Sequence, residues 1–405
     1  MNRLTSRLLA AALCGAAALA PALLLAQTPQ PTPQPAPRPA VPTPTPQPPS
    51  VEGTAWLLMD HGTGQILLGH NVDARVEPAS IAKVMTSYVV AAEMAAGKVG
   101  ADDQVRISEN AWRRGGGGTD GSTSFLPVNS AHRLQDLLHG MIVQSGNDAS
   151  IALAEHVAGS EEAFASLMNA YAQKLGMTGS SYANATGLPH PELYTTARDV
   201  AVLARALIRD FPESYAVHSM KELTINGITQ HNRNSLLWRD PTVDGLKTGH
   251  TRAAGFCLVA SAQREGMRLI TVVMGSSSER RRADDSQALL NYGFRFFEAH
   301  QLYAGGEALS EPRIWKSSRD TLPVGLQEPL QIVVPRGKYE QIRAVLDLPK
   351  PLIAPATQGQ AIGTLRLSLD GETLVERPLI ALEDAPEAGF LGRSWDAMQL
   401  WWESD

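Results

Sequence analysis

Ser80-Ile81-Ala82-Lys83 stands where an irregular, turn-rich segment gives way to a long apolar run. The approach contains Pro78, which disfavours helical backbone at the residue before it, and residues 84–94 are apolar enough for a buried helix. A serine in the first turn of a helix and a lysine three positions later lie on one face, within side-chain reach. The spacing therefore predicts a hydroxyl held beside an amine, which is the geometry of a nucleophile with its own base.

The composition limits the functions that the chain can have. With 405 residues, 43% of them hydrophobic and 19% charged, the chain is long enough for two globular domains or a large domain with a smaller one. A net charge of −6 gives no basic surface for nucleic acid. The sequence has no Gly-x-x-x-x-Gly-Lys-Ser/Thr phosphate loop, and the glycine run at 115–118 lacks the strand-to-helix context of a dinucleotide site. No histidine has a partner four positions later. We therefore expect no cofactor, no metal and no nucleic-acid partner.

The N-terminal segment predicts export. Arg3 and Arg7 precede an apolar run from residue 8 to 26, which is typical of a secretory signal peptide cleaved after Ala26. A transmembrane anchor is the alternative, because the run is close to the minimum spanning length. Residues 27–50 are almost entirely Pro, Gln, Thr and Ala and predict an extended linker. Cleavage leaves Cys257 as the only cysteine, so no internal disulfide is expected.

Residues 51–300 predict one α/β domain, and residues 301–385 predict a small all-β domain. The expected elements of the first are a hairpin at 54–70, helices at 84–94, 134–143, 148–158, 161–176 and 196–211, antiparallel strands at 246–248, 255–262 and 267–274, and a final helix at 284–299. In the second, short apolar runs at 330–334, 342–346 and 361–367 alternate with Pro and Gly turns. Asp370-Gly371 is a strong hairpin signal between two of its strands.

Residues 386–405 predict a terminal amphipathic helix. Its apolar face carries Leu391, Trp395, Met398 and Trp402. Tryptophans at a chain end fit a helix that lies in the membrane interface, so we expect membrane association. The alternative is a helix docked on the protein itself, and the mostly acidic polar positions would not attract anionic lipids.

Two further motifs bear on Ser80 and Lys83. A Ser-x-x-Lys pattern alone occurs roughly once or twice by chance in a chain of this length, whereas Lys-Thr-Gly, at 247–249, is expected only about 0.1 times. A Ser-x-Asn element would complete the set, and the chain has two. Ser108-Glu109-Asn110 opens a short helix, where the serine is more simply an N-cap. Ser145-Gly146-Asn147 lies between two apolar helices, where side chains can point into a cleft, and we choose it.

The ordered set of motifs resembles that of penicillin-binding proteins and serine β-lactamases. The flanking residues, at 77–86, 184–188 and 247–255, resemble the low-molecular-weight D-alanyl-D-alanine carboxypeptidases. The resemblance runs from about residue 51 to the end, since that family also has a C-terminal β domain and an amphipathic membrane anchor. It implies a serine β-lactamase/DD-peptidase-like domain, with an antiparallel sheet flanked by helices, in a periplasmic protein attached peripherally to the inner membrane.

The resemblance also implies a reaction. Ser80 would attack the carbonyl of the penultimate D-alanine in a peptidoglycan pentapeptide stem, release the terminal D-alanine, and react in the same way with β-lactams. Desolvation and the nearby Lys247 cation would lower the pKa of Lys83, which would then accept the serine proton. Ser145 would relay a proton to the leaving group, and Asn147 would orient Lys83.

The other predicted site residues bind substrate. The resemblance implies that the amides of Ser80 and His250 form the oxyanion hole. Thr248, within the Lys247-Thr248-Gly249 strand, would hold the terminal carboxylate with help from Arg282. The Arg280–Arg282 run could instead be a solvated turn.

Three alternative functions use similar chemistry or the same fold. β-Lactamases of the most similar pattern carry a Glu-x-x-x-Asn loop, but no asparagine follows Glu192 in residues 189–196, and the appended β domain is foreign to those enzymes. D,D-endopeptidases tend to lack that β domain, which favours a carboxypeptidase. A non-catalytic peptidoglycan-binding protein is disfavoured because all three motifs are intact.

Overall fold

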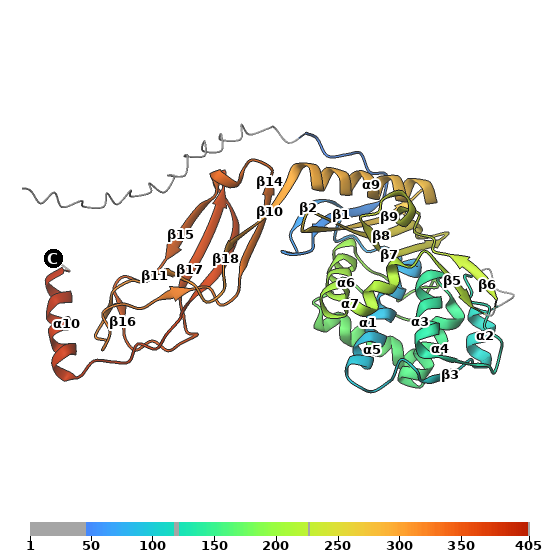
Figure 1. The fold of residues 1–405 in the computed structure, drawn as a ribbon, viewed down its shortest axis with the longest axis horizontal. Coiled ribbons are helices and arrows are strands. Elements are labelled where there is room, and N and C mark those ends of the chain that lie inside the picture. The colour runs from blue at the N-terminus through green and yellow to red at the C-terminus, as the bar shows by residue number, and fades with distance from the viewer. Residues whose placement is uncertain (1–45, 117–120, 226, 404–405) are drawn as a thin grey trace, which may run out of the picture. The chain divides into compact units, whose positions relative to one another are not determined.

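The computed structural model describes residues 46–116, 121–225 and 227–403 (Figure 1). The predicted signal peptide and most of the predicted linker lie outside this range. The described chain begins with a helix-rich α/β part and continues with short strands and a terminal helix.

Five helices in the middle of the chain confirm the predicted ones. They are α1 (Ala82–Ala95), α3 (Leu134–Val143), α4 (Asn147–Ala158), α5 (Glu161–Lys174) and α6 (Ala197–Asp210). Shorter elements join them: α2 (Glu109–Gly115), α7 (Pro212–Ala216), α8 (Leu236–Arg239), and the 3₁₀ turns η1 (Ala79–Ile81) and η2 (Val217–Ser219). Ser80 lies in η1, one turn ahead of α1, so Ser80 and Lys83 share the start of one continuous helical segment.

The main sheet has the strand order β2-β1-β9-β8-β7, and every neighbouring pair is antiparallel. Its strands are β1 (Ala55–Asp60), β2 (Ile66–His70), β7 (Val243–Thr251), β8 (Gly255–Arg264) and β9 (Met267–Ser276). The predicted N-terminal hairpin and the predicted antiparallel strands are confirmed.

Both faces of the main sheet are buried. Because successive side chains on a strand point to opposite faces, Leu57 packs in a cluster with Val84 of α1, whereas Leu58 packs in a second cluster with Leu289. Figure 1 shows helix α9 (Glu279–Phe296) over one face, with α1 and α6 on the other. The resulting two-sided core holds β7, the strand that carries the Lys-Thr-Gly motif, against η1.

Helix α9 corrects the predicted range 284–299. It starts at Glu279 because the Ser278 hydroxyl accepts a hydrogen bond from the Arg281 amide, 3.1 Å away, and so caps the helix. The arginine-rich first turn has no apolar periodicity, so the sequence pattern missed it. The last predicted residues, from Phe297 onward, belong instead to strand β10 (Phe297–Tyr303), which pairs with β14 (Leu330–Pro335).

The C-terminal part contains a five-stranded sheet in the order β11-β13-β18-β17-β15. Its strands are β11 (Ala308–Ser310), β13 (Val324–Gly325), β15 (Arg343–Asp347), β17 (Ala361–Leu369) and β18 (Glu372–Ala381). Asp370 and Gly371, both with positive φ, form the predicted hairpin turn. Smaller pairs are β3 (Gln104–Arg106) with β4 (Ala131–Arg133), β5 (Glu222–Ile225) with β6 (Ile228–His231), and β12 (Ile314–Trp315) with β16 (Leu352–Ile353). A 3₁₀ turn, η3 (Tyr339–Gln341), precedes β15.

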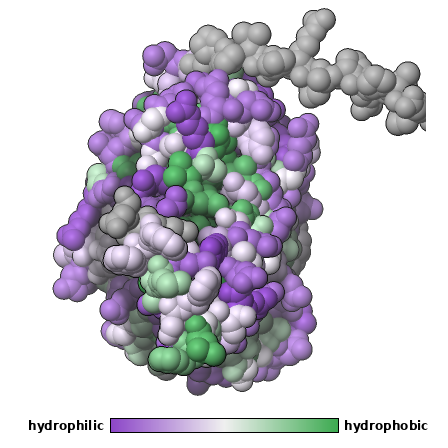
Figure 2. Space-filling model, turned by 90° about the vertical axis from the view of Figure 1, so that its left-hand side faces the viewer, coloured by the Kyte–Doolittle hydropathy of each residue, from purple (hydrophilic) through white to green (hydrophobic). Residues whose placement is uncertain are grey.

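The terminal helix α10 (Phe390–Glu403) presents its apolar residues to solvent. Trp395 is 60% exposed and Trp402 is 75% exposed, whereas the Asp396 carboxylate accepts a hydrogen bond from the Lys316 amide. Figure 2 shows apolar side chains gathered in patches on a face that is otherwise largely hydrophilic. Within the described residues, no helix combines the length and apolar character needed to cross a bilayer.

Candidate active site

The backbone directly before Ser80 has an unusual conformation. Ala79, the preceding residue, has a φ of 47°, a left-handed value that costs a non-glycine residue roughly 1–3 kcal/mol. A Cβ added to Gly187 would overlap the Ala79 carbonyl, and one added to Gly249 would come within 3.2 Å of the Ile81 amide nitrogen. The two glycines therefore let a loop and strand β7 press against η1 from either side.

Lys83 is the buried base candidate. It is only 1% exposed, and its Nζ lies 3.0 Å from Ser80 Oγ, 2.8 Å from Asn147 Oδ1 and 2.6 Å from the Thr186 carbonyl oxygen. Burial, aided by the positive charge of Arg233, lowers the pKa of Lys83 to about 7, against the opposing carboxylates of Asp148 and Glu161. A large share of Lys83 is therefore neutral near pH 7 and able to accept the Ser80 proton.

Ser145 and Asn147 enter the site from the junction of α3 and α4. Ser145 has a φ of 64°, and its buried Oγ has no hydrogen-bond partner among the described residues. Asn147 is the first residue of α4, and its backbone N–H donates to the Ser122 carbonyl at 2.8 Å. Ser145 thus brings a strained backbone and an unused hydroxyl to the same cavity as Ser80, where the hydroxyl can form a hydrogen bond with a bound molecule.

Strand β7 contributes a second buried lysine. Lys247 is 3% exposed, and its Nζ lies 3.3 Å from the Thr248 carbonyl oxygen. Burial holds the pKa of Lys247 well below its usual range, and repulsion by Lys83, Arg233 and Arg282 acts in the same direction. The charge of Lys83 therefore disfavours the protonated form of Lys247.

These groups surround a cavity of about 140 Å³. Of the nine residues predicted from the sequence, seven line it: Ser80, Ser145, Asn147, Thr248, Gly249, His250 and Arg282. The other two, Lys83 and Lys247, are buried behind the lining. Arg282 donates from Nη1 to the Gly249 carbonyl at 3.1 Å, and the His250 ring stacks on Phe256 with 4.0 Å between ring centroids.

Sequence reasoning missed charged groups of the site, among them Arg233 and Asp148. Arg233 lines the cavity, but it lies between β6 and α8 in a stretch without a recognisable motif. Asp148 is fully buried, and its carboxylate accepts hydrogen bonds from the Ser124 and Leu126 amides and the Thr123 hydroxyl. Its position directly after Ser145-Gly146-Asn147, in an apolar helix, was the available signal.

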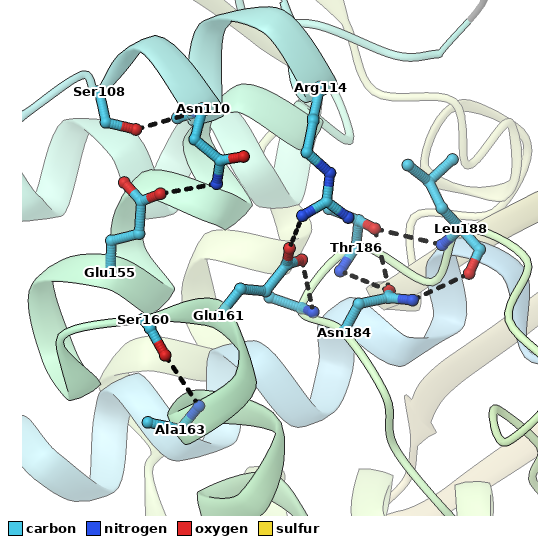
Figure 3. A network of polar contacts seen from close by, with 12 residues as sticks. Ser108, Asn110, Arg114, Glu155, Ser160, Glu161, Ala163, Asn184, Thr186 and Leu188 are labelled. Atoms are coloured by element: carbon cyan, nitrogen blue, oxygen red, sulfur yellow. Dashed lines mark hydrogen bonds and ion pairs between the residues drawn. The ribbon is translucent and has the colours of Figure 1, made fainter.

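The second Ser-x-Asn element has the predicted structural role. The Ser108 hydroxyl caps α2 by accepting from the Ala111 amide at 2.9 Å, and Asn110 donates to Glu155 at 2.8 Å (Figure 3). A larger hollow of about 690 Å³ lies beside this helix, but its serine is occupied by the cap. Chemistry rather than size therefore identifies the site, and Ser145-Gly146-Asn147 is the element that reaches Lys83.

Two parts of the chain match models of known protein families. A family model described as D-alanyl-D-alanine carboxypeptidase matches residues 43–278. The chain belongs to this family. A second model, described as the C-terminal domain of penicillin-binding protein 5, matches residues 297–387. As a family member the chain is a peptidase, and the predicted fold class of a DD-peptidase-like domain with an appended β domain and a terminal helix is confirmed.

Individual relatives cover most of this family member. It is 44% identical to D-alanyl-D-alanine carboxypeptidase DacC of Escherichia coli over 355 residues, which are 87% of this chain and 89% of that protein. The crystal structure of penicillin-binding protein 5 from Haemophilus influenzae matches with a TM-score of 0.81 at 40% identity, covering 84% of this chain and 99% of that one. Penicillin-binding protein D2 from Listeria monocytogenes in its ampicillin-bound form matches with a TM-score of 0.56 at 27% identity, over 61% of this chain and 100% of that one.

Proposed function

We propose that the chain is a serine carboxypeptidase that removes the terminal D-alanine from peptidoglycan pentapeptide stems through an acyl-enzyme on Ser80. The observation that carries this proposal is the 3.0 Å contact between Lys83 Nζ and Ser80 Oγ, at a cavity, in a member of this peptidase family. β-Lactams would acylate the same hydroxyl.

In acylation, neutral Lys83 accepts the Ser80 proton while Oγ attacks the carbonyl carbon of the penultimate D-alanine. The carbonyl oxygen becomes an oxyanion, which the amides of Ser80 and His250 stabilise. As the C–N bond breaks, the leaving amine takes a proton from the Ser145 hydroxyl, which is replenished from the protonated lysine. Free D-alanine departs and leaves an ester on Ser80.

Deacylation reverses these roles. A water molecule loses a proton to the same base, attacks the ester carbonyl, and Ser80 Oγ leaves as the alcohol after taking a proton back. Asn147 keeps Lys83 in place through both steps, because its Oδ1 accepts from Lys83 Nζ.

Substrate binding relies on positive charge at the cavity wall. Arg282, Arg233 and Thr248 all line the cavity, and Thr248 directly follows Lys247 in strand β7. We propose that Thr248 and Arg282 hold the terminal carboxylate of the peptide, because guanidinium groups bind carboxylates through strong, charge-assisted hydrogen bonds. The bound peptide would lie along β7, in contact with Lys247-Thr248-Gly249 and His250.

Labelling with a fluorescent penicillin tests the nucleophile. Wild type should label and Ser80→Ala should not, whereas Ser108→Ala, a matched serine from the other Ser-x-Asn element, should still label. Release of D-alanine from a pentapeptide ending in D-Ala-D-Ala then separates a carboxypeptidase from a binding protein, and cleavage of crosslinked peptides instead would indicate an endopeptidase. A wild type that neither labels nor releases D-alanine would contradict the proposal.

We further propose that the protein is exported to the periplasm and binds the inner membrane through α10, with domains divided near residues 300 and 385. The exposed tryptophans of α10 support this placement, because indole rings favour the membrane interface. Vesicles should retain the full chain and release one shortened by residues 389–405. Replacing Trp395, Trp401 and Trp402 with serine should also release it, and equal binding of all three proteins would count against the helix.

A further inference from the structure

Glu161 is a buried carboxylate that the proposed reaction does not use. It is the first residue of α5 and is 4% exposed. Its Oε2 lies 2.6 Å from Nη1 of Arg114, at the end of α2, and its Oε1 accepts a hydrogen bond from the Ala185 amide at 3.2 Å. Figure 3 shows the Glu161 side chain between Arg114 and the loop that carries Asn184 and Thr186.

That loop, residues 184–188, forms a closed set of hydrogen bonds. Asn184 Oδ1 accepts from the Thr186 amide, the Thr186 hydroxyl and the Gly187 amide, and its Nδ2 donates to the Leu188 carbonyl. Ala185 ties the loop to other elements. Its amide donates to Glu161, and its carbonyl accepts from the Thr86 hydroxyl at 2.8 Å. The next carbonyl, that of Thr186, is the one that receives Lys83.

We propose that the Glu161–Arg114 pair positions Lys83 for catalysis by fixing the Ala185–Thr186 backbone. Among the described hydrogen bonds, the Lys83 amine contacts Ser80, Asn147 and one backbone carbonyl, that of Thr186. The Glu161–Arg114 pair connects helices α2 and α5 to the loop that carries this carbonyl. Glu161 touches neither substrate nor the reacting atoms, so it acts through the loop and through its charge.

The charge of Glu161 gives the pair a measurable signature. The charged groups that act on Lys83 are Asp148 from α4, Glu161 from α5, Arg233 ahead of α8 and Lys247 from β7. Burial and the cations lower the Lys83 pKa, and the two carboxylates raise it. The Asp148 carboxylate accepts hydrogen bonds from the Ser124 and Leu126 amides. Glu161 is therefore the carboxylate that both acts on Lys83 through its charge and binds the backbone of the 184–188 loop.

The test is the pH profile of acylation, and it rests on the proposed function of Ser80 and Lys83. The second-order rate constant for labelling by a fluorescent penicillin is measured from pH 5 to 9. Wild type should show an ascending limb as Lys83 loses its proton. A wild type without this limb would overturn the proposed base together with this inference, whereas a limb that is present in wild type and unmoved in the variants would overturn the inference alone.

The variants have opposite expected signs. Glu161→Gln keeps the shape and the acceptor but loses the charge, so the limb should move to lower pH by about 0.5–1 unit. Arg114→Met removes the opposing cation, so the limb should move to higher pH. Glu161→Ala should in addition lower the plateau rate roughly tenfold, because the Ala185 amide loses its acceptor.

Glu93 provides the matched control. It is also buried, and it pairs with Lys98 at 2.6 Å and accepts from the Tyr171 hydroxyl at 2.8 Å, away from the cavity lining. Glu93→Gln should leave the limb at the wild-type pH. A Glu161→Gln limb that coincides with that of Glu93→Gln, or a loss of plateau rate with no movement of the limb, would overturn the positioning role.

Discussion

Replacing Lys83 with methionine should change how the free energy of unfolding depends on pH. A lysine in the unfolded chain keeps its proton up to its ordinary pKa of 10.5, whereas burial lowers the pKa of Lys83 to about 7 in the folded chain. Between these values the unfolded state binds more protons than the folded state. The stability of wild type therefore rises with pH in this window, and the methionine variant lacks the contribution.

The size of the effect follows from the two pKa values. One unit of difference in pKa corresponds to about 1.4 kcal/mol. From pH 7 to pH 9, Lys83 passes from about half protonated to nearly neutral in the folded state, so wild type should gain about 2 kcal/mol relative to Lys83→Met. Groups that titrate alike in both proteins cancel. Lys247, which Lys83 repels, changes the difference in the same direction.

Urea unfolding at pH 7 and pH 9, followed by tryptophan fluorescence, gives the required free energies. Lys98→Met is the control, because the Lys98 side chain is 64% exposed and has no comparable burial. A difference between wild type and Lys83→Met that changes by less than about 0.5 kcal/mol over this range, near the error of such extrapolations, would refute the lowered pKa.

Three further variants test other parts of the site. Ser145→Ala should slow penicillin acylation by about 10²-fold, yet leave the melting temperature unchanged because the hydroxyl has no partner among the described residues; stopped-flow labelling and calorimetry measure the two effects. Gly187→Ala should abolish labelling and destabilise the fold by more than about 2 kcal/mol, because Gly187 has a φ of +80° and an added Cβ would overlap the Ala79 carbonyl. An unchanged midpoint of urea unfolding would contradict this strain. Arg282→Gln should raise the KM for D-alanine release by roughly tenfold with a smaller effect on kcat, and an unchanged KM would remove Arg282 from carboxylate binding.

The sequence predicted the elements whose apolar periodicity is strong. The two lysines and two serines that the structure brings to one cavity were predicted because each belongs to a short motif. The helices and strands around them have buried, regularly spaced apolar residues. The start of α9 was missed because its first turn is held by the Ser278 cap rather than by apolar side chains.

The charged groups around Lys83 could not be predicted from motifs or from apolar periodicity. Arg233, Glu161 and Asp148 come from three separate segments, and only the packing of α4, α5 and the segment before α8 brings them to one amine. The Glu161–Arg114 pair joins residues 47 positions apart. Long-range polar pairs leave no periodic trace in a single sequence, so the charged groups that shift the Lys83 pKa could be identified only from the structure.

The strained and charged groups of this site are concentrated where η1, strand β7 and the 184–188 loop meet. Ala79 and Ser145 have positive φ values, and both lysines are buried, so the folded chain carries several unfavourable terms in one small volume. The apolar clusters on both faces of the main sheet offset them. Because Gly187 and Gly249 let the loop and β7 approach η1, a Cβ at Gly187 would overlap the Ala79 carbonyl, and one at Gly249 would crowd Ala79 and Ile81, the residues on either side of Ser80. These two glycines, one in the 184–188 segment and one in Lys247-Thr248-Gly249, therefore hold the backbone around Ser80 by leaving room for close packing.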